Sequence, residues 1–206
     1  TVLLCGIGGV GSYTLEALVR MGVGKIILVD NDLVSITNLN RQIIALNSTI
    51  GKLKVEVAKE RAIDINNNII IETHPIFIND ETVDSLFNSH IDYIVDAVDT
   101  VNAKVNLIKK AKELNIPIIS SMGTGNKLDP TKLKITDISK TEYCPLAKVM
   151  RQKLRELNIK HLKVLTSSEP PIKVQEVKDE NGRQIIGSTS IAGLMIASEV
   201  IKDLIK

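Results

Sequence analysis

A cluster of glycines directly after the first apolar segment constrains the fold of this chain more than any other feature. Residues 2–5 are apolar, and Gly6, Gly8 and Gly11 follow in the spacing G-x-G-x-x-G, with Gly9 as an extra glycine. Glycine permits a tight turn and a close approach of the backbone to a phosphate, and the N-terminus of a following helix offers free N–H groups. The cluster therefore predicts a strand, a phosphate-binding loop and a helix. A nicotinamide dinucleotide and ATP both satisfy this pattern, and a tight turn without a ligand is the simplest alternative.

Short apolar runs alternate with segments of helical spacing along the first 120 residues. Because the runs are continuous and β-branched, we predict buried parallel strands at Val2–Cys5, Lys25–Asp30, Ile69–Thr73, Tyr93–Ala97 and Ile116–Ser120. Helical spacing predicts helices at Gly11–Met21, Gly51–Asn66, Asp80–Asn88 and Val101–Asn115. This alternation is typical of an α/β protein with a Rossmann-like, doubly wound sheet.

The pattern changes after residue 130. Lys132–Ile138 alternates polar and apolar residues, and His161–Thr166 is a second candidate strand, so we expect a mostly parallel sheet with antiparallel strands added in the C-terminal part. Helices are predicted at Pro145–Leu157 and Thr189–Ile205, and a loop or hairpin at Ser167–Ser188. A length of 206 residues suits one domain, 1–206. We divide it into a nucleotide-binding half, 1–126, and a C-terminal half, 127–206, with a basic crossover segment at 141–188.

Charge is unevenly distributed along the chain. The net charge is +2, yet residues 127–173 hold eleven Lys or Arg against five Asp or Glu, which gives +6. A basic segment on an otherwise slightly acidic body indicates a polyanionic partner. A helix over Pro145–Leu157 whose lysines simply face water explains the same charges.

Composition excludes several classes of protein. Cys5 and Cys144 are the only cysteines, too few for a disulfide framework or a four-cysteine zinc site, and this fits the reducing cytoplasm. We find no signal peptide and no apolar run long enough to span a bilayer, so we expect a cytoplasmic protein without membrane contact. Because the first strand begins at once without a Met, we also expect residues before Thr1.

The polar segment 30–42 distinguishes between the two nucleotides. Asp30 ends the second predicted strand nineteen residues after Gly11, where an acid normally binds ribose hydroxyls. Hydride transfer leaves a pyrophosphate intact, whereas cleavage of ATP between its α and β phosphates builds charge that Arg and Lys must stabilise. Arg41 is one candidate and Lys54 another, although Lys54 taken by itself would favour an exposed helical lysine.

The fourth predicted strand ends in I-V-D-A-V-D-T, residues 94–100. Asp96 and Asp99 therefore lie at the carboxyl end of a strand, where open α/β sheets bind their ligands. Mg²⁺ is commonly held by one or two carboxylates together with phosphate oxygens, and Asp99 fits that role. The alternative is that Asp99 caps the following helix.

Four motifs occur in a fixed order: G-I-G-G-V-G-S, D-N-D-x-V-x-x-x-N-L-N-R-Q, a Gly-x-x-Lys at 51–54, and D-A-V-D-T. Together they resemble the E1-like, ThiF-type adenylating superfamily, whose members activate a carboxylate as an acyl-adenylate and release pyrophosphate. The resemblance implies that ATP and Mg²⁺ are required and that the protein is a homodimer. It also implies that Asp30 binds the ribose of ATP, that Asn38, Arg41 and Lys54 line the phosphates, and that Asp99 holds Mg²⁺.

The resulting site prediction has three parts. We predict that the catalytic residues are Arg41, Lys54 and Asp99. Asp99 is also the predicted metal ligand. The predicted nucleotide-binding residues are Gly6, Gly8, Gly9, Gly11, Asp30, Asp32, Asn38, Arg41, Gln42 and Lys54. Gly9 is expected to leave room for the α-phosphate and the incoming carboxylate.

Motifs in the second half of the chain resemble one particular family within this superfamily. G-x-G-x-x-x-D-P-T-x-x-x-I-T-D-x-x-K-T at 123–141, then Pro145-Leu146-Ala147 and the basic Arg151, Lys153 and Arg155, are similar to bacterial tRNA threonylcarbamoyladenosine dehydratases. In that family ATP activates the threonyl carboxylate of N6-threonylcarbamoyladenosine in tRNA, and a hydantoin ring then closes. The resemblance thus implies tRNA carrying this nucleoside as the substrate, and a sulfur-transfer protein as a further partner. The basic segment is compatible with contacts to tRNA phosphates.

Other functions stay open at this point. An activator of a sulfur-carrier or ubiquitin-like protein is the main alternative, but such sulfur-carrier activators commonly carry a four-cysteine zinc site. Ubiquitin-activating relatives use a catalytic cysteine after the sheet, which would be Cys144, while the dehydratase pattern requires none. A non-catalytic nucleotide-binding scaffold would not need Arg41, Lys54 and Asp99, and an NAD-dependent dehydrogenase is the remaining alternative.

Overall fold

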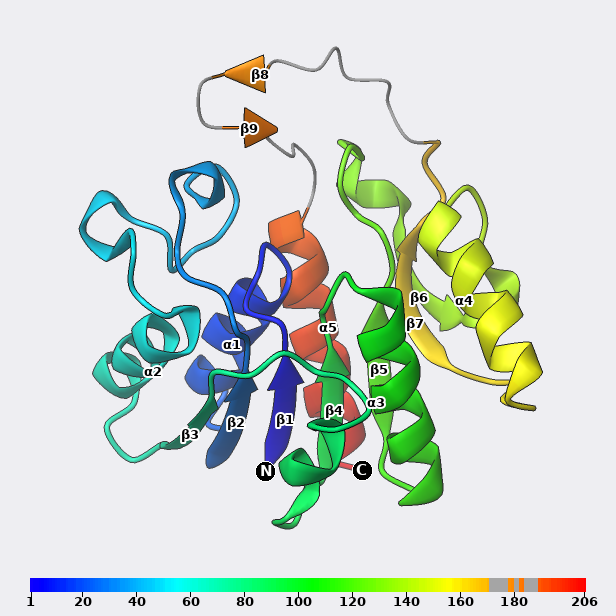
Figure 1. Ribbon diagram of the computed structural model, residues 1–206, viewed down its shortest axis with the longest axis horizontal. Coiled ribbons are helices and arrows are strands. Elements are labelled where there is room, and N and C mark those ends of the chain that lie inside the picture. The colour runs from blue at the N-terminus through cyan, green and yellow to red at the C-terminus, as the bar shows by residue number, and fades with distance from the viewer. Residues whose placement is uncertain (171–177, 180–181, 184–188) are drawn as a thin grey trace.

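The computed structural model describes residues 1–170, 178–179, 182–183 and 189–206. Within these residues a seven-stranded sheet has the order β3-β2-β1-β4-β5-β7-β6 (Figure 1). Its strands are β1 (Val2–Cys5), β2 (Lys25–Val29), β3 (Ile70–His74), β4 (Tyr93–Asp96), β5 (Ile118–Ser121), β6 (Leu133–Asp137) and β7 (Lys163–Ser167). Neighbouring strands are parallel except β6, which runs antiparallel to β7. A separate antiparallel pair joins β8 (Lys178–Asp179) to β9 (Gly182–Arg183).

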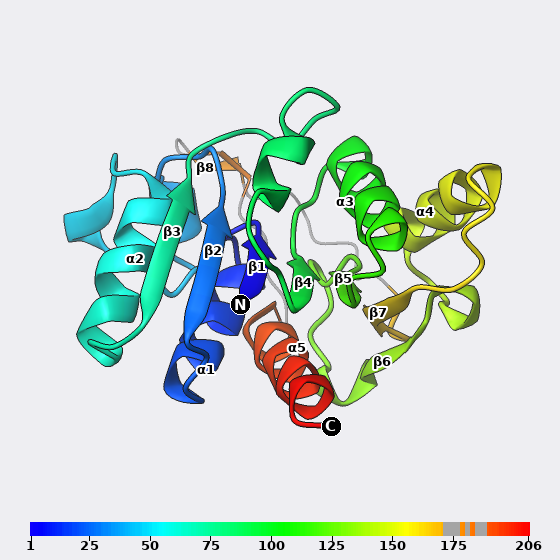
Figure 2. The same ribbon diagram turned by 90° about the horizontal axis from the view of Figure 1, so that it is seen from below.

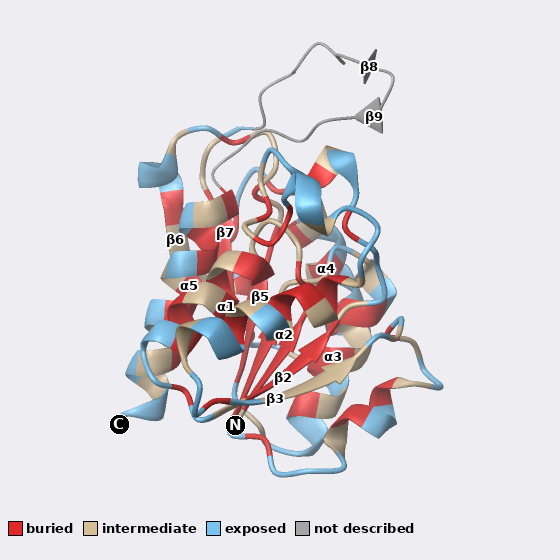
Figure 3. Cartoon of the chain, turned by 90° about the vertical axis from the view of Figure 1, so that its left-hand side faces the viewer, coloured by how far each residue is buried: buried red, intermediate tan, exposed pale blue. Residues whose placement is uncertain are grey.

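Helices cover both faces of the sheet. The helices are α1 (Gly11–Arg20), α2 (Lys54–Ile65), α3 (Val101–Glu113), α4 (Pro145–Glu156) and α5 (Thr189–Leu204). Apolar residues of α1, α2 and α5 share one core with Val2 and Leu4 of β1, whereas α3 and α4 share a second core with Leu3 and Cys5. Figure 2 shows α1 and α5 on one side of the sheet and α3 and α4 on the other. Figure 3 shows the buried residues concentrated in the strands and the facing sides of the helices.

The predicted elements correspond closely to the observed ones, and the α/β fold class is confirmed. β3 is the main correction, because we expected a fully buried strand and Ile70–His74 is only partly buried. The strand order explains the difference, since β3 lies at the edge of the sheet. The helix expected at Asp80–Asn88 is instead a short 3₁₀ helix at Val83–Phe87.

The β8–β9 pair lies inside the segment expected to be a loop or hairpin. Residues 171–177, 180–181 and 184–188 of that segment, and of the crossover 141–188, lie outside the described residues. Among the helices that the structure describes, none combines the length and the apolar character that crossing a membrane requires.

The sheet has a switch point between β1 and β4. From β1 the chain adds β2 and β3 on one side, then crosses to place β4 on the other side, so the loops after β1 and β4 diverge. Ligands bind at such a divergence in open α/β sheets. Gly6 directly follows β1 with φ +88°, and a Cβ there would lie 2.6 Å from the carbonyl oxygen of Ala97. A glycine is therefore needed because the loop after β1 passes so close to the loop after β4.

Candidate functional site

A cavity of about 510 Å³ lies at the carboxyl ends of β1, β2, β4 and β5. The loops after these strands and the beginnings of α2 and α5 line it. Nearly all predicted site residues are found there, namely Gly6, Gly8, Gly9, Asp30, Asp32, Asn38, Arg41, Gln42, Lys54 and Asp99. Gly11 is the exception. A Cβ at Gly11 would lie 1.8 Å from the Gly6 carbonyl oxygen, so this glycine allows the loop to fold back on itself.

The glycine loop joins β1 to α1 at the floor of the cavity. The Ile7 N–H donates to Asp30 Oδ2 at 2.6 Å, which ties the loop to the end of β2. Helix α1 begins without a side-chain cap, so no side chain competes for the N–H groups of its first turn. A Cβ on Gly9 would lie 2.9 Å from Thr189 Oγ1, so Gly9 makes room for the first residue of α5. Sequence reasoning assigned no role to Thr189, which also lines the cavity.

Lys54 lies between two carboxylates. Its Nζ donates to Asp32 Oδ2 at 2.7 Å and lies 4.0 Å from Asp30 Oδ1. The residue is only 5% exposed, which rules out an exposed helical lysine. Burial raises the pKa of Asp30, and the Lys54 charge opposes that shift. The three groups together place two negative charges and one positive charge beside the glycine loop when both acids are ionised.

Arg41 reaches the cavity from the long connection between β2 and α2. Its Nη1 donates to the Thr37 carbonyl oxygen at 2.7 Å and to Asn40 Oδ1 at 2.9 Å. A guanidinium carries five N–H donors, so these bonds orient the group and leave donors for a ligand. Burial lowers the pKa of Arg41, and the Asp99 charge opposes this shift.

Two buried amides stand beside Arg41. Asn38 Oδ1 accepts from the Ser35 N–H at 3.0 Å and so holds the connection in shape. Gln42 is 5% exposed, and its Oε1 has no hydrogen-bond partner among the described residues although Gln42 lines the cavity. An unpaired buried acceptor costs free energy. This oxygen therefore marks a place where a donor from a ligand or a water would be favourable.

Asp99 lies exposed at the cavity wall, beyond the end of β4. Its carboxylate accepts a hydrogen bond from Thr100 Oγ1 at 3.4 Å. The N-cap of α3 is Thr100, without a side-chain cap, so Asp99 does not cap that helix. No cluster of three or more His, Cys, Asp or Glu suited to a metal occurs in the described part of the chain. One carboxylate fits Mg²⁺ nonetheless, because this ion takes most of its ligands from phosphates and water.

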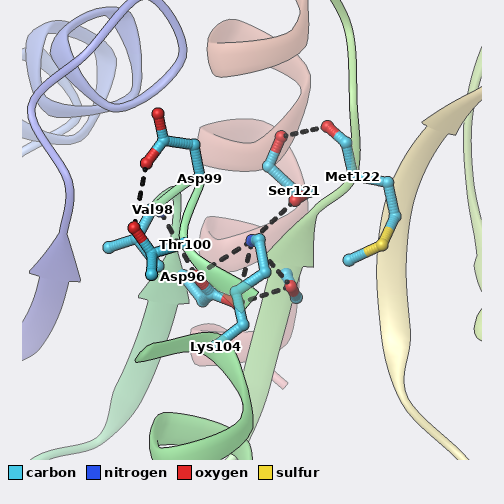
Figure 4. Close-up of polar contacts among 8 residues, drawn as sticks. Asp96, Val98, Asp99, Thr100, Lys104, Ser121 and Met122 are labelled. Atoms are coloured by element: carbon cyan, nitrogen blue, oxygen red, sulfur yellow. Dashed lines mark hydrogen bonds and ion pairs between the residues drawn. The ribbon is translucent and has the colours of Figure 1, made fainter. Parts of the chain in front are cut away.

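Asp96, which was expected with Asp99 at the ligand-binding end of the strand, is instead part of a buried polar cluster whose other members sequence reasoning missed (Figure 4). Lys104 and Asp96 are fully buried and form an ion pair with an N–O distance of 3.1 Å. Ser120 Oγ donates to Asp96 Oδ2 at 2.5 Å. One feature of the sequence could have indicated this cluster, namely a lysine on the apolar face of a helix. Ala103, Leu107 and Ala111 of α3 are buried alongside Lys104.

Both cysteines have structural surroundings. Cys144 is buried and caps α4, because its Sγ accepts from the Ala147 N–H at 3.4 Å. Cys5 lies in β1, where burial raises the pKa of its thiol. Burial therefore disfavours a thiolate at Cys5, whereas the observed role of Cys144 is to cap α4.

Comparisons with known proteins show which family the chain resembles in sequence and structure. A family model described as the ThiF family matches residues 1–206. The tRNA threonylcarbamoyladenosine dehydratase of Bacillus subtilis (strain 168) is 44% identical over 221 residues, covering 100% of this chain and 87% of that protein. The E. coli tRNA N6-threonylcarbamoyladenosine dehydratase TcdA in complex with AMP matches with a TM-score of 0.91 and 32% identity, over 99% of this chain and 85% of that one. Its complex with ATP gives a TM-score of 0.86 and 30% identity, over 98% and 86% of the two chains.

Proposed function

Because the chain belongs to the ThiF family, we propose that it is an ATP-dependent tRNA threonylcarbamoyladenosine dehydratase. The observation that carries this proposal is the position of two cations and a carboxylate, Arg41, Lys54 and Asp99, around one cavity with the glycine loop. Hydride transfer would not need these charges, whereas cleavage of a phosphoanhydride does. Solved structures of the E. coli relative with AMP and ATP support ATP as the nucleotide.

In the first step the threonyl carboxylate of the modified adenosine attacks the α-phosphorus of ATP. A new P–O bond forms, and the bond from the α-phosphorus to the oxygen that bridges to the β-phosphate breaks. Asp30 accepts hydrogen bonds from the ribose, and the first turn of α1 faces the phosphates. Arg41 and Lys54 stabilise the charge that builds on the departing pyrophosphate. Lys54 can turn from Asp32 toward a phosphate because Asp32 is mostly exposed and so keeps its hydration.

In the second step a urea nitrogen of the same nucleoside attacks the activated carbonyl carbon. The nitrogen loses a proton, AMP leaves with one former carboxylate oxygen, and the hydantoin ring closes. The nucleoside has then lost one water overall. The nucleophile belongs to the substrate, so the reaction needs no enzyme thiol, which agrees with the capping role of Cys144. The sulfur-carrier activator considered above is not favoured, because a relative that is 44% identical over the whole chain is named a dehydratase.

Mg²⁺ is part of the proposal. Asp99 would hold the ion, since its carboxylate is exposed at the cavity and is not used as a helix cap. The ion supplies positive charge that offsets the charge of the triphosphate. Arg41 and Asp99 line the same cavity, and the Asp99 charge raises the pKa of Arg41 against the effect of burial.

The proposed polynucleotide partner is tRNA carrying N6-threonylcarbamoyladenosine. Helix α4 supports this partner, because Leu146 in its first turn lines the cavity and the exposed Lys148, Lys153 and Arg155 follow. Phosphates on either side of the modified nucleoside could bind along this helix while the nucleoside enters the cavity.

We also propose a cytoplasmic homodimer that works as one adenylation domain. The pairing of β5 with β7 supports one domain, because it joins the halves 1–126 and 127–206 in one sheet. Exposed Leu33, Ile36, Leu46 and Ile50 on the β2–α2 connection support an interface with a second copy. Two unpaired cysteines agree with the cytoplasm. A sulfur-transfer partner stays a prediction from the resemblance.

The decisive experiment is to incubate the protein with ATP, Mg²⁺ and tRNA that carries threonylcarbamoyladenosine. Mass spectrometry of the digested nucleosides should show the loss of one water from this nucleoside, with AMP and pyrophosphate formed in equal amounts. Omission of ATP is the control. An unchanged nucleoside together with ATP–pyrophosphate exchange that depends on a small carrier protein would instead support the sulfur-carrier activator.

A further inference from the structure

The ammonium group of Lys104 joins the ends of two neighbouring strands. Its Nζ donates to both carboxylate oxygens of Asp96 at 3.1 Å and to the carbonyl oxygen of Ser121 at 2.8 Å. Asp96 is the last residue of β4 and Ser121 the last of β5. Figure 4 shows the Lys104 side chain rising from α3 into the space between these strand ends. One buried cation therefore connects two strands through both charge and hydrogen bonds.

Each of the two strands leads directly into a loop that lines the cavity. After β4, the Val98 N–H donates to Asp96 Oδ1 at 3.3 Å, and Val98, Asp99 and Thr100 line the cavity. After β5, residues 121–125 line the cavity. The Lys104–Asp96 pair is therefore bonded to the start of both loops, including the one that carries Asp99.

Stability of the fold does not by itself explain the buried Lys104–Asp96 ion pair. Taking two charges out of water offsets much of their attraction, and well-packed apolar replacements of such pairs are often neutral or stabilising. Lys104 lies on the otherwise apolar buried face of α3, so the chain places a charge here together with the carboxylate that it needs as a partner. The position of this charge behind two cavity loops therefore calls for a functional explanation.

We propose that Lys104 is a positioning residue for the adenylation step, a proposal that rests on the function proposed above. Through Asp96 it sets the loop of Asp99, and through the Ser121 carbonyl it sets loop 121–125. Both loops are thereby fixed before the nucleotide binds. Such preorganisation lowers the barrier, because the groups do not have to be ordered as charge develops. Lys104 itself does not touch the substrate.

The test uses a double variant, Asp96→Asn with Lys104→Met, which removes both charges and keeps similar side-chain volumes. We expect thermal unfolding by circular dichroism and ATP affinity by calorimetry to change little. Turnover of the modified tRNA should fall about tenfold or more. The Mg²⁺ concentration for half-maximal rate should rise, and amide hydrogen exchange at 97–100 and 121–125 should speed up. Wild-type turnover and wild-type exchange in this folded variant would overturn the proposal.

A milder variant keeps the proposal testable if the double variant does not fold. Ser120→Ala leaves both charges in place and removes a hydroxyl that bonds to Asp96 and Lys104. It should cause a smaller loss of turnover and faster exchange in the same two loops, and unchanged values for both would count against the proposal. The wild-type protein in the same assay tests the proposed function separately. If the wild-type protein does not dehydrate the nucleoside, the proposed function fails. The amide hydrogen exchange rates of the two loops in wild type and variants still show whether Lys104 holds the loops.

Discussion

Arg41 illustrates how a single residue is made ready for a ligand that is not yet bound. Its own connection holds the guanidinium through two hydrogen bonds from Nη1, so little conformational freedom is lost when a phosphate arrives. The desolvation that lowers its pKa also strengthens its attraction to an anion, because less water screens the charge. Arg41 is therefore the residue whose loss should separate catalysis from folding.

Arg41→Ala should abolish measurable pyrophosphate release while the fold survives. Removing one preorganised donor of a charged transition state typically costs about 10²–10³ in rate. Release is measured with a coupled pyrophosphatase assay, and folding by circular dichroism. Arg20→Ala is the matched control, since Arg20 is an exposed arginine at the end of α1. Undiminished ATP cleavage by Arg41→Ala would refute the assigned role.

Asp30 should make ATP binding depend on pH. Burial raises the pKa of this carboxyl, so the folded protein disfavours its charged form. The group therefore contributes stability at low pH that is lost as the pH rises through its folded pKa. Binding of ribose hydroxyls as an ionised acceptor has the opposite dependence, and ATP affinity should weaken as the pH falls through the same range.

Calorimetric titration with ATP, at pH values rising from the ordinary range of a carboxyl pKa, measures this effect. Asp30→Asn is the control, because it keeps the shape and an acceptor oxygen but cannot titrate. Protonation of ATP itself affects both proteins equally, so the difference between their profiles isolates Asp30. Parallel profiles would mean that Asp30 does not titrate in the nucleotide site.

At the scale of elements, local patterns predicted most strands and helices but not their environment. Continuous apolar runs identify strands such as β1 and β4, because both of their faces are covered. The same kind of run in β3 gave no sign that it lies at an edge, since strand order depends on contacts between distant segments.

Site residues, like strands, could be predicted where the signal is local and could not where it depends on contacts between distant segments. Residues inside contiguous motifs, such as Asp30 and Arg41, could be predicted because their spacing is local. Ser121 and Thr189 could not, because only the folded sheet and α5 bring them to the cavity, and the same holds for Lys104, which lies behind the cavity and bonds Ser121. The roles of these residues depend on which strand ends are neighbours, and no short segment of the sequence predicts the strand order.

The contact between α1 and α5 predicts a sensitive glycine. A Cβ on Gly193 would lie 2.3 Å from the Val10 carbonyl oxygen, so Gly193→Ala must push the two helices apart. Overpacking of this kind costs about 1–3 kcal/mol. We expect thermal unfolding to begin at a clearly lower temperature by differential scanning calorimetry. Gly24→Ala is the control, because a Cβ there meets nothing within 4 Å. Equal stability of the two variants would contradict the close helix contact.

Helix α4 should behave as a tRNA-binding element. Replacing Lys148, Lys153 and Arg155 by Glu should weaken tRNA binding and reduce its salt dependence, because each contact to a phosphate releases counterions. ATP affinity should not change. Filter binding over a range of salt concentrations measures both effects. Lys109→Glu and Lys112→Glu in the last turns of α3, combined with Lys202→Glu in the last turn of α5, change the net charge by the same amount and are the control. Equal weakening by both sets of changes would point to general electrostatics and not to α4.

At the scale of the whole molecule, the β2–α2 connection links the site to the proposed dimer. It carries Asn38, Arg41 and Gln42 on its cavity side and exposes large apolar side chains elsewhere. Covering those side chains with a second copy would remove apolar surface from water and hold the connection in place. Dimerisation would then stabilise the same segment that orients Arg41.

Leu46→Glu should therefore convert a dimer into a monomer and weaken pyrophosphate release at the same time. Leu46 is 53% exposed, so the change should not disturb the core, but a carboxylate in an apolar interface would lose its hydration. Light scattering after size-exclusion chromatography measures the mass, and the coupled assay measures release. Ile205→Glu is the control, because Ile205 is exposed at the C-terminal end, away from this connection. A monomeric wild-type protein, or a Leu46→Glu variant that stays dimeric, would exclude this surface as the interface. A monomeric variant with full activity would show that the dimer does not support the site.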